Sequence, residues 1–366
     1  MPILQKIVIQ DFRNIVMQEM TFSRNINCIS GNNGEGKTNL LDAIHYLSMT
    51  KSVNGPSDRF NFRHGTKSFS IGGTYEMPSG QISKISIKVS EGADKKLVKD
   101  DKTFSKVSDY IGTIPVVMVS PSDTSLVSES GEDRRRFINS VLSQMDRNYL
   151  SDVQKYNKLL LQRNAALKAD NPDESLLEAL DSGMAIFAAH IYERRKAFVE
   201  DLVPAVQEHY TRLSGGREIV GIRYSSDLEK TDMFSLLAQS RGKDLALRYT
   251  SAGPHRDDFI FEMDGHPIRR CGSQGQQKSF LVSLKFAQYD IMKRNSGHAP
   301  ILLLDDLFDK LDMDRTSNLL RMVSGNDFGQ IFITDSNKVR LEGIIDGITQ
   351  ERKYLETAGG VFTECE

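Results

Sequence analysis

Gly31-Asn32-Asn33-Gly34-Glu35-Gly36-Lys37-Thr38 is the most informative segment of this chain. Its glycines, lysine and threonine match the pattern G-x-x-x-x-G-K-[ST]. An apolar segment at residues 26–29 precedes it, and Leu40, Leu41, Ile44 and Leu47 follow at helical spacing. The pattern therefore predicts a loop between a buried strand and a helix N-terminus, the context of a phosphate-binding loop. The alternative is an ordinary glycine-rich turn between a strand and a helix.

This loop has the chemistry that a nucleotide requires. Glycines allow backbone N–H groups to wrap around a phosphate, and the helix N-terminus adds partial positive charge. Lys37 can reach the β- and γ-phosphates, and Thr38 can hold Mg²⁺. We therefore expect ATP and Mg²⁺ as cofactors. The predicted nucleotide-binding residues of the loop are Gly31, Asn32, Asn33, Gly34, Glu35, Gly36, Lys37 and Thr38.

Composition limits the class of protein. The chain has 366 residues, 39% hydrophobic and 26% charged, which predicts about two globular domains. No apolar run approaches the ~20 residues that cross a membrane, and we expect no signal peptide. Its three cysteines form no disulfide or zinc pattern, which is typical of a cytoplasmic protein. With a net charge of −2, any DNA-binding surface must be a local patch.

Periodicity predicts a strand-containing region that a helical segment interrupts. Residues 69–76, 82–89 and 115–119 have strand patterns. The chain from 132 to 213 is mostly helical, with a break at 170–173, and predicts an antiparallel helical hairpin that Pro204 bends or ends. The last predicted strand is 330–334. The predicted domains are residues 1–120 (ATPase lobe, N-terminal part), 121–215 (helical insertion) and 216–366 (ATPase lobe, C-terminal part).

Charge is unevenly distributed. Residues 59–106 contain 10 Lys and Arg against 5 Asp and Glu, so this segment is a candidate phosphate-contacting surface or else a solvated sheet face. Residues 121–215 contain 12 against 15 and make a poor general DNA platform. Two arginine clusters there, at 134–136 and 194–196, are more typical of solvated helix faces. The first DNA-contact candidates are Arg59, Arg63, Lys95, Lys96 and Lys99.

Two carboxylates follow the apolar run at residues 301–304. This pattern predicts a buried strand that ends in Asp305 and Asp306, at the sheet edge where ligands gather. Asp305 is the candidate Mg²⁺ ligand, and Asp306 is the candidate base for the attacking water. We predict Asp306 and Lys37 as the catalytic residues. The alternative, that two carboxylates merely end a strand, is weak because they are awkward there without a cation.

Residues 273–277 have two compatible interpretations. They loosely match the signature loop of ABC-type ATPases, which makes Ser273, Gly275 and Gln276 candidate nucleotide contacts. Ser273 and Gln276 also form a capping box for the helix that follows. A helix N-terminus capped in this way also suits a γ-phosphate. Leu311-Asp312 follows at the position of a dimer-interface loop.

The chain resembles the RecF family of bacterial recombination mediators over essentially its whole length. The Gly253-Pro254-His255-Arg256-Asp257-Asp258 and Ser273-Gln274-Gly275-Gln276-Gln277 motifs are the most specific parts of this resemblance. The other matching pieces are Asp11-Phe12-Arg13-Asn14, the phosphate loop, Ser120-Pro121, Arg134-Arg135-Arg136-Phe137 and Asp305-Asp306.

The resemblance implies an α/β fold: an ABC-type ATPase head with a mixed sheet, an antiparallel β part and an inserted helical lobe. It adds Arg13 to the nucleotide-binding residues and implies an ATP-dependent homodimer in which Ser273 contacts the nucleotide of the other protomer. It further implies binding to single-stranded DNA and to single-strand/duplex junctions, and cooperation with RecO and RecR to load RecA in DNA repair and replication restart.

Two positions differ from the pattern of transporter ATPases. Thr334-Asp335 stands where those proteins have a switch histidine, and residues 120–123 form no convincing glutamine loop. These differences predict slow hydrolysis that acts as an off-switch. The alternatives are the nucleotide-binding subunit of a membrane transporter and a nucleotide-binding structural protein without turnover.

Overall fold

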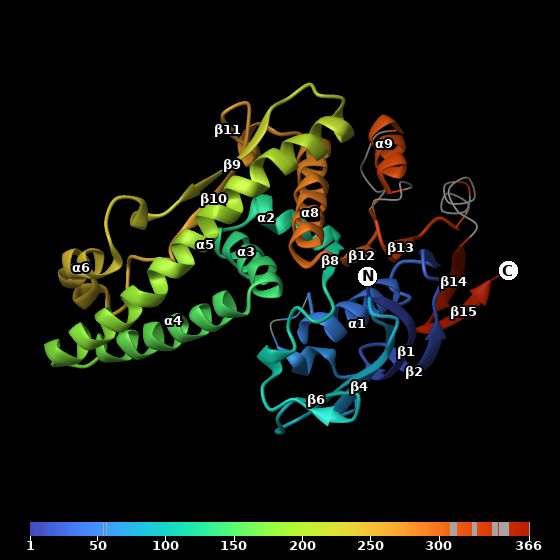
Figure 1. Ribbon diagram of the computed structural model, residues 1–366, viewed down its shortest axis with the longest axis horizontal. Coiled ribbons are helices and arrows are strands. Elements are labelled where there is room, and N and C mark those ends of the chain that lie inside the picture. The colour runs from blue at the N-terminus through green and yellow to red at the C-terminus, as the bar shows by residue number, and fades with distance from the viewer. Residues whose placement is uncertain are drawn as a thin grey trace. The chain divides into compact units, whose positions relative to one another are not determined.

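Two six-stranded sheets build the part of the protein that contains the phosphate loop (Figure 1). The computed structural model describes residues 1–53, 55, 57–307, 313–323, 328–338, 343 and 351–365. The chain divides into two compact units. The first unit comprises residues 1–123, 212–214 and 274–366, and the second comprises 124–211 and 215–273.

The first sheet of unit 1 is antiparallel, with the order β2-β1-β4-β5-β6-β7. Its strands are β1 (Ile3–Phe12), β2 (Ile15–Thr21), β4 (Ser68–Glu76), β5 (Ile82–Ser90), β6 (Lys96–Lys99) and β7 (Lys102–Thr103). Along β5, buried and exposed residues alternate, which places Ile85, Ile87 and Val89 in the core and leaves Lys84 and Lys88 exposed.

The second sheet has the order β15-β14-β3-β13-β12-β8. Its strands are β3 (Ile26–Ser30), β8 (Val116–Val119), β12 (Ile301–Leu304), β13 (Ile331–Asp335), β14 (Arg352–Ala358) and β15 (Val361–Cys365). The neighbours from β14 to β8 pair in parallel, and only β15 is antiparallel. The carboxyl ends of five strands therefore meet at one edge, where α/β sheets bind their ligands.

Helix α1 (Lys37–Met49) packs into one hydrophobic core with residues from both sheets. Leu40, Leu41, Ile44 and Leu47 are each at most 1% exposed, as their spacing predicts. Burying each such side chain contributes roughly 1.5–3 kcal/mol, so α1 is firmly held behind the phosphate loop. Among the described residues, this unit also contains α8 (Gln274–Ser296), which contacts β8, and α9 (Met313–Val323).

Helices dominate unit 2. They are α2 (Ser125–Ser128), α3 (Gly131–Met145), α4 (Arg147–Ala166), α5 (Glu174–Ser214, whose last three residues belong to unit 1), α6 (Met233–Leu247) and α7 (Ile268–Cys271). Its small sheet has the order β11-β10-β9, from β9 (Val220–Ser225), β10 (Asp258–Met263) and β11 (His266–Pro267). Short 3-10 turns occupy Asp58–Asn61, Val107–Asp109, Pro121–Thr124 and Asp227–Glu229.

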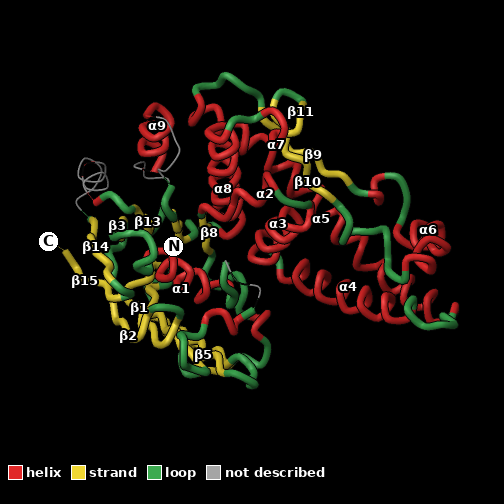
Figure 2. The backbone as a smooth tube through the Cα atoms, turned by 180° about the vertical axis from the view of Figure 1, so that it is seen from behind, coloured by secondary structure: helices red, strands yellow, loops and turns green. Residues whose placement is uncertain are grey.

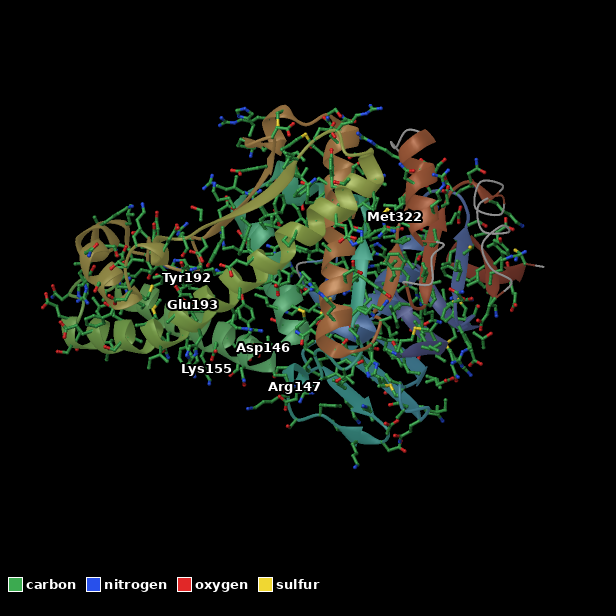
Figure 3. All side chains as sticks on the ribbon, turned by 45° about the horizontal axis from the view of Figure 1, so that its top comes forward. Asp146, Arg147, Lys155, Tyr192, Glu193 and Met322 are labelled. Atoms are coloured by element: carbon green, nitrogen blue, oxygen red, sulfur yellow. The ribbon has the colours of Figure 1, made fainter. Side chains whose placement is uncertain are left out.

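Helices α4 and α5 lie side by side as the predicted hairpin (Figures 1 and 2). The expectation of one long first helix is wrong, because Asp146 leaves the helical conformation between α3 and α4. Figure 3 labels Asp146 and the next residue, Arg147, with which α4 begins. The Asp146 carboxylate accepts hydrogen bonds from the first N–H groups of α4 and pairs with Arg194 at 3.0 Å. Pro204 does not end α5, which continues to Ser214.

Two arginines from the helices of unit 2 bind the motif at residues 253–258. Arg195, 3% exposed, donates to the carboxylate of Asp257 at 2.9 Å and to the carbonyl of Pro254 at 2.7 Å. Arg134 makes a two-pronged pair with Asp258 at 2.8 and 3.0 Å. Arg134 therefore holds α3 to the first residue of β10, and Arg195 holds α5 to the residues just before it. Both side chains are bound by protein groups, so the prediction that they are solvated is wrong.

Three further elements differ from the expectations. The hairpin β6–β7 and the helix α6 both lie in segments for which no strand or helix was predicted. The last strand is β15, because β14 and β15 join the parallel sheet through pairing with β3. Residues 216–273 group with the helical unit, whereas the predicted boundary assigned them to the ATPase lobe. Among the described residues, no helix is both long and apolar enough to cross a membrane.

Candidate nucleotide-binding site

The phosphate loop joins the end of β3 to the first residue of α1, as its motif predicts. Gly31, Gly34 and Gly36 have φ angles of 152°, 87° and 112°, a region that favours glycine. Gly36 caps α1 without a side-chain hydrogen bond. The first N–H groups of α1 therefore have no side-chain cap, and they form a ready site for an anion.

Lys37 folds back over this loop. Its ammonium group donates to the carbonyl oxygens of Gly31 at 2.7 Å and Asn32 at 3.1 Å, and the residue is 4% exposed. The cation is thus held at the loop that would receive the phosphates. A phosphate oxygen is a stronger acceptor than a neutral carbonyl, so these contacts are suited to exchange for a nucleotide.

Thr38 and Asp305, which lie 267 residues apart, meet beside the loop. The Thr38 hydroxyl is 3.0 and 2.9 Å from the two carboxylate oxygens of Asp305. Burial raises the pKa of the Asp305 carboxyl above its ordinary value, and hydrogen bonds from Thr334 and Thr38 oppose this effect. A hydroxyl and a buried carboxylate are oxygen donors that suit Mg²⁺. These residues therefore fit the predicted metal.

Thr334 links the two acidic residues, a role that the sequence did not indicate. Its hydroxyl donates to Asp305 at 2.7 Å and accepts from the N–H of Asp306 at 3.0 Å. Asp306 has a φ of 43°, a strained conformation for a residue with a side chain. β12 and β13 are parallel neighbours, so the residues at their carboxyl ends lie close together. Pairing of these two predicted strands is the feature of the sequence that could have indicated the contact of Thr334 with Asp305. The assignment of Asp306 as the base stays a prediction.

Arg13 lies next to the loop but is bound by protein groups. Its guanidinium donates to Asn39 at 3.0 Å, Ser52 at 2.7 Å and Asn61 at 3.2 Å, and pairs with Asp42 at 2.5 Å. These contacts hold the first turns of α1 against the segment that follows the helix. The contact of Arg13 with nucleotide stays a prediction.

The signature residues begin α8. Ser273 directly precedes the helix, and Gly275 and Gln276 lie in its first turn. Ser273 is the last residue of unit 2, whereas α8 belongs to unit 1. Their contact with a nucleotide on another protomer stays a prediction. Leu311 and Asp312 lie outside the described residues.

Comparison with known proteins identifies the family. The RecF/RecN/SMC N terminal domain family matches residues 3–353. A Parabacteroides distasonis protein, "DNA replication and repair protein RecF", is 43% identical over 365 residues and the match covers 100% of both chains. A Bacteroides fragilis protein of the same name is 40% identical over 365 residues, 100% of this chain and 99% of its own. The chain belongs to the RecF family.

Solved structures agree with this assignment. The structure described as the recombination mediator protein RecF-ATP in the RecFOR pathway has a TM-score of 0.90 and 27% identity, and the match covers 100% of this chain and 98% of that one. A Pyrococcus furiosus Smc head domain has a TM-score of 0.56 at 15% identity, which shows a shared fold alone. The predicted α/β fold of an ABC-type ATPase head is thereby confirmed.

The basic residues proposed for DNA contact in this RecF family member differ in availability. Arg63 pairs with Asp11 at 2.7 Å. Lys95 pairs with Asp58 at 2.9 Å, and burial lowers its pKa. Both cations already have a partner. Arg59 and Lys96 are exposed and Lys99 is half-buried, so these three are the stronger candidates for phosphate contacts.

Proposed function

We propose that the protein binds ATP with Mg²⁺ and, as an ATP-dependent homodimer, binds DNA in replication and recombinational repair. In this proposal it acts at single-strand/duplex junctions in the cytoplasm and helps RecO and RecR to load RecA. Two relatives at 40% and 43% identity are named DNA replication and repair proteins, and a solved relative was described with ATP. Their agreement along the whole chain supports the assignment.

The meeting of Thr38 with Asp305 is the observation that carries the nucleotide part. Thr38 lies in the first turn of α1 and Asp305 directly follows β12, and the two side chains converge at 2.9 Å beside the glycine loop. Thr38 and Asp305 would hold Mg²⁺, which would supply positive charge to neutralise the phosphates. Lys37 would neutralise the β- and γ-phosphates, and the N–H groups of the loop and of α1 would orient them.

Hydrolysis is proposed to be slow and to end the DNA-bound state. Asp306 would orient and deprotonate the attacking water. Thr334 replaces the switch histidine of transporter ATPases, and its hydroxyl is already engaged with Asp305 and with the Asp306 backbone. A hydroxyl held in this way positions the carboxylates but supplies no titrating group near neutral pH. This difference favours an enzyme with low turnover.

DNA is proposed to bind through phosphate contacts. The net charge of −2 gives no general attraction to DNA, so a few exposed cations must provide it. Arg59, Lys96 and Lys99 on unit 1 are the candidates that the structure leaves accessible. The transporter alternative is set aside because the chain belongs to the RecF family along its whole length.

DNA binding measured with and without nucleotide tests this function. Fluorescence anisotropy with a gapped oligonucleotide would compare the protein in Mg²⁺-ATP, in Mg²⁺ alone and as Lys37→Ala in Mg²⁺-ATP. We expect tight binding only in the first sample, because Lys37 is the loop's own side-chain cation. Equal DNA affinity in all three samples would refute the ATP-dependent function, and a loss of affinity in Mg²⁺ alone would support it.

A further inference from the structure

The C-terminal hairpin β14–β15 lies directly against the phosphate loop. β14 pairs in parallel with β3, and Leu355 and Glu356 are the partners of Ile29 and Ser30 at its end. The next residue of β14, Thr357, faces the first residue of the loop. A Cβ added to Gly31 would lie 2.6 Å from the carbonyl oxygen of Thr357. The loop and the hairpin are thus in close backbone contact.

Three hydrogen bonds join the hairpin to Glu35 in the loop. The Glu35 carbonyl accepts from the Thr357 hydroxyl at 3.0 Å and from the Gly360 N–H at 2.9 Å. Its carboxylate accepts from the Gly359 N–H. Glu35 lies between Gly34 and Gly36, two glycines with positive φ angles. Its backbone is therefore fixed by a segment more than 300 residues away in the chain.

The turn of the hairpin also contacts Asn14, whose side chain lies next to Gly36 of the loop. Gly359 and Gly360 form a two-residue turn with φ angles of 57° and 81°, the signature of a type I′ turn. A Cβ on Gly360 would lie 2.5 Å from the carbonyl oxygen of Asn14, whereas one on Gly359 would meet nothing within 4 Å. The Asn14 side chain in turn lies 3.0 Å from the position of a Cβ on Gly36.

We infer that the C-terminal β-hairpin positions the phosphate loop for nucleotide, with Thr357 and Gly360 as positioning residues. A loop with glycines at positive φ has many accessible conformations, and ordering it on binding costs free energy. The hairpin fixes the middle of the loop before the nucleotide arrives. The inference rests on the proposed function, since it assumes that this loop binds ATP.

The two glycines of the turn provide a matched test. Gly359→Ala and Gly360→Ala both place alanine at positive φ, but only the second also pushes against Asn14. ATP affinity would be measured by equilibrium dialysis, and the melting temperature of the nucleotide-free protein would be measured alongside. We expect Gly360→Ala to weaken ATP binding about tenfold relative to Gly359→Ala, a difference of about 1.4 kcal/mol.

Hydrogen exchange separates positioning from a general loss of stability. In nucleotide-free Gly360→Ala, the amides of residues 32–36 should exchange faster, while those of β12 and β13 should keep the protection that they have in Gly359→Ala. Equal ATP affinity and equal loop exchange in the two variants would overturn the inference. If Gly360→Ala does not fold, Thr357→Val and Thr357→Ser give a second comparison.

Valine keeps the shape of Thr357 and removes its hydroxyl, whereas serine keeps the hydroxyl. We expect Thr357→Val to bind ATP about fivefold more weakly than Thr357→Ser, since one hydrogen bond contributes about 1 kcal/mol. Equal binding by these two would also contradict the inference. If the wild-type protein itself does not bind ATP, the proposed function falls and the inference falls with it. If the wild type binds and the paired variants do not differ, the inference alone is wrong.

Discussion

Replacing Thr334 with valine removes one hydroxyl from the end of β13 while it preserves the shape of the side chain. Thr334 is fully buried, and its hydroxyl donates to Asp305 at 2.7 Å and accepts from the Asp306 N–H at 3.0 Å. A hydrogen bond to a carboxylate contributes about 1.5–3 kcal/mol, and a neutral one about 1 kcal/mol. Thr334→Val should therefore lower the free energy of unfolding by about 2.5–4 kcal/mol.

Thr334→Ser is the matched control, because it keeps the hydroxyl and loses a methyl group. That loss should cost about 1 kcal/mol, and serine is also the weaker strand former. Packing and strand propensity should therefore make Thr334→Val more stable than Thr334→Ser. Only the hydrogen bonds of the hydroxyl should make Thr334→Ser the more stable of the two variants. Urea unfolding followed by circular dichroism measures both variants. Valine at least as stable as serine would refute the bridging role of Thr334, and valine clearly less stable would support it.

Three more outcomes follow from the structure. Asp306→Asn should keep its affinity for ATP but hydrolyse it more slowly in a steady-state phosphate-release assay, and the ATP-bound dimer should persist in sedimentation. A loss of ATP affinity would instead mean that Asp306 is a metal ligand or a structural group. A plot of the logarithm of the DNA-binding constant against the logarithm of salt concentration should have a slope of about −0.9 per phosphate contact. Lys96→Ala should reduce the magnitude of this slope by about 1, whereas Lys95→Ala should leave it unchanged because Lys95 already pairs with Asp58. Burial lowers the pKa of His255 to about 4, so the free energy of unfolding should fall by up to about 3 kcal/mol as the pH drops from about 6.5 to 4. In urea titrations, His255→Gln should abolish this loss of stability with falling pH, whereas a variant at an exposed histidine, His190→Gln, should still show it.

The sign of the His255 effect follows from its contacts. The imidazole donates through Nε2 to the Thr250 carbonyl at 3.0 Å, and its Nδ1 lies 2.8 Å from the Tyr156 hydroxyl, which donates to it. This arrangement suits the neutral ring. The unfolded chain takes up a proton below pH ~6.5, whereas the folded protein does so only near pH 4. Stability is therefore complete above pH ~6.5 and decreases as the pH falls.

Local patterns predicted the central parts of the site. The strand before the loop, the buried face of α1 and the strand that ends in Asp305 are all encoded by a few adjacent residues, and each forms as expected. Their meeting also followed, since the carboxyl ends of parallel strands share one edge. Thr38 and Asp305, the predicted metal ligands, lie within hydrogen-bond distance of each other, and their binding of a metal stays a prediction.

The rest depends on pairings between distant segments. β14 has no strong alternation of its own and becomes a strand through pairing with β3. Arg134 and Arg195 belong to basic clusters that are typical of solvated helices, yet carboxylates of the 253–258 motif bind them. The break at Asp146 was hidden because the apolar spacing continues across it, and only its capping contacts separate α3 from α4. This strand, these ion pairs and this helix break depend on contacts with residues that are distant in the sequence, and a local pattern does not reveal such contacts.

In the proposed dimer, ATP joins two copies of this chain at two composite sites, each of which combines the Lys37 loop of one copy with Ser273 of the other. Mixing Lys37→Ala protein with Ser273→Ala protein tests it most directly, with the ATPase rate as the measurement. In a mixed dimer, one composite site has both defects and the other has an intact Lys37 loop opposite an intact Ser273. We expect about a quarter of the wild-type rate from an equal mixture with free exchange and independent sites, although each variant is inactive alone. Since loss of the Ser273 cap should cost ~1 kcal/mol, thermal melting must show that Ser273→Ala is folded. A folded mixture with no recovered activity would contradict the shared site.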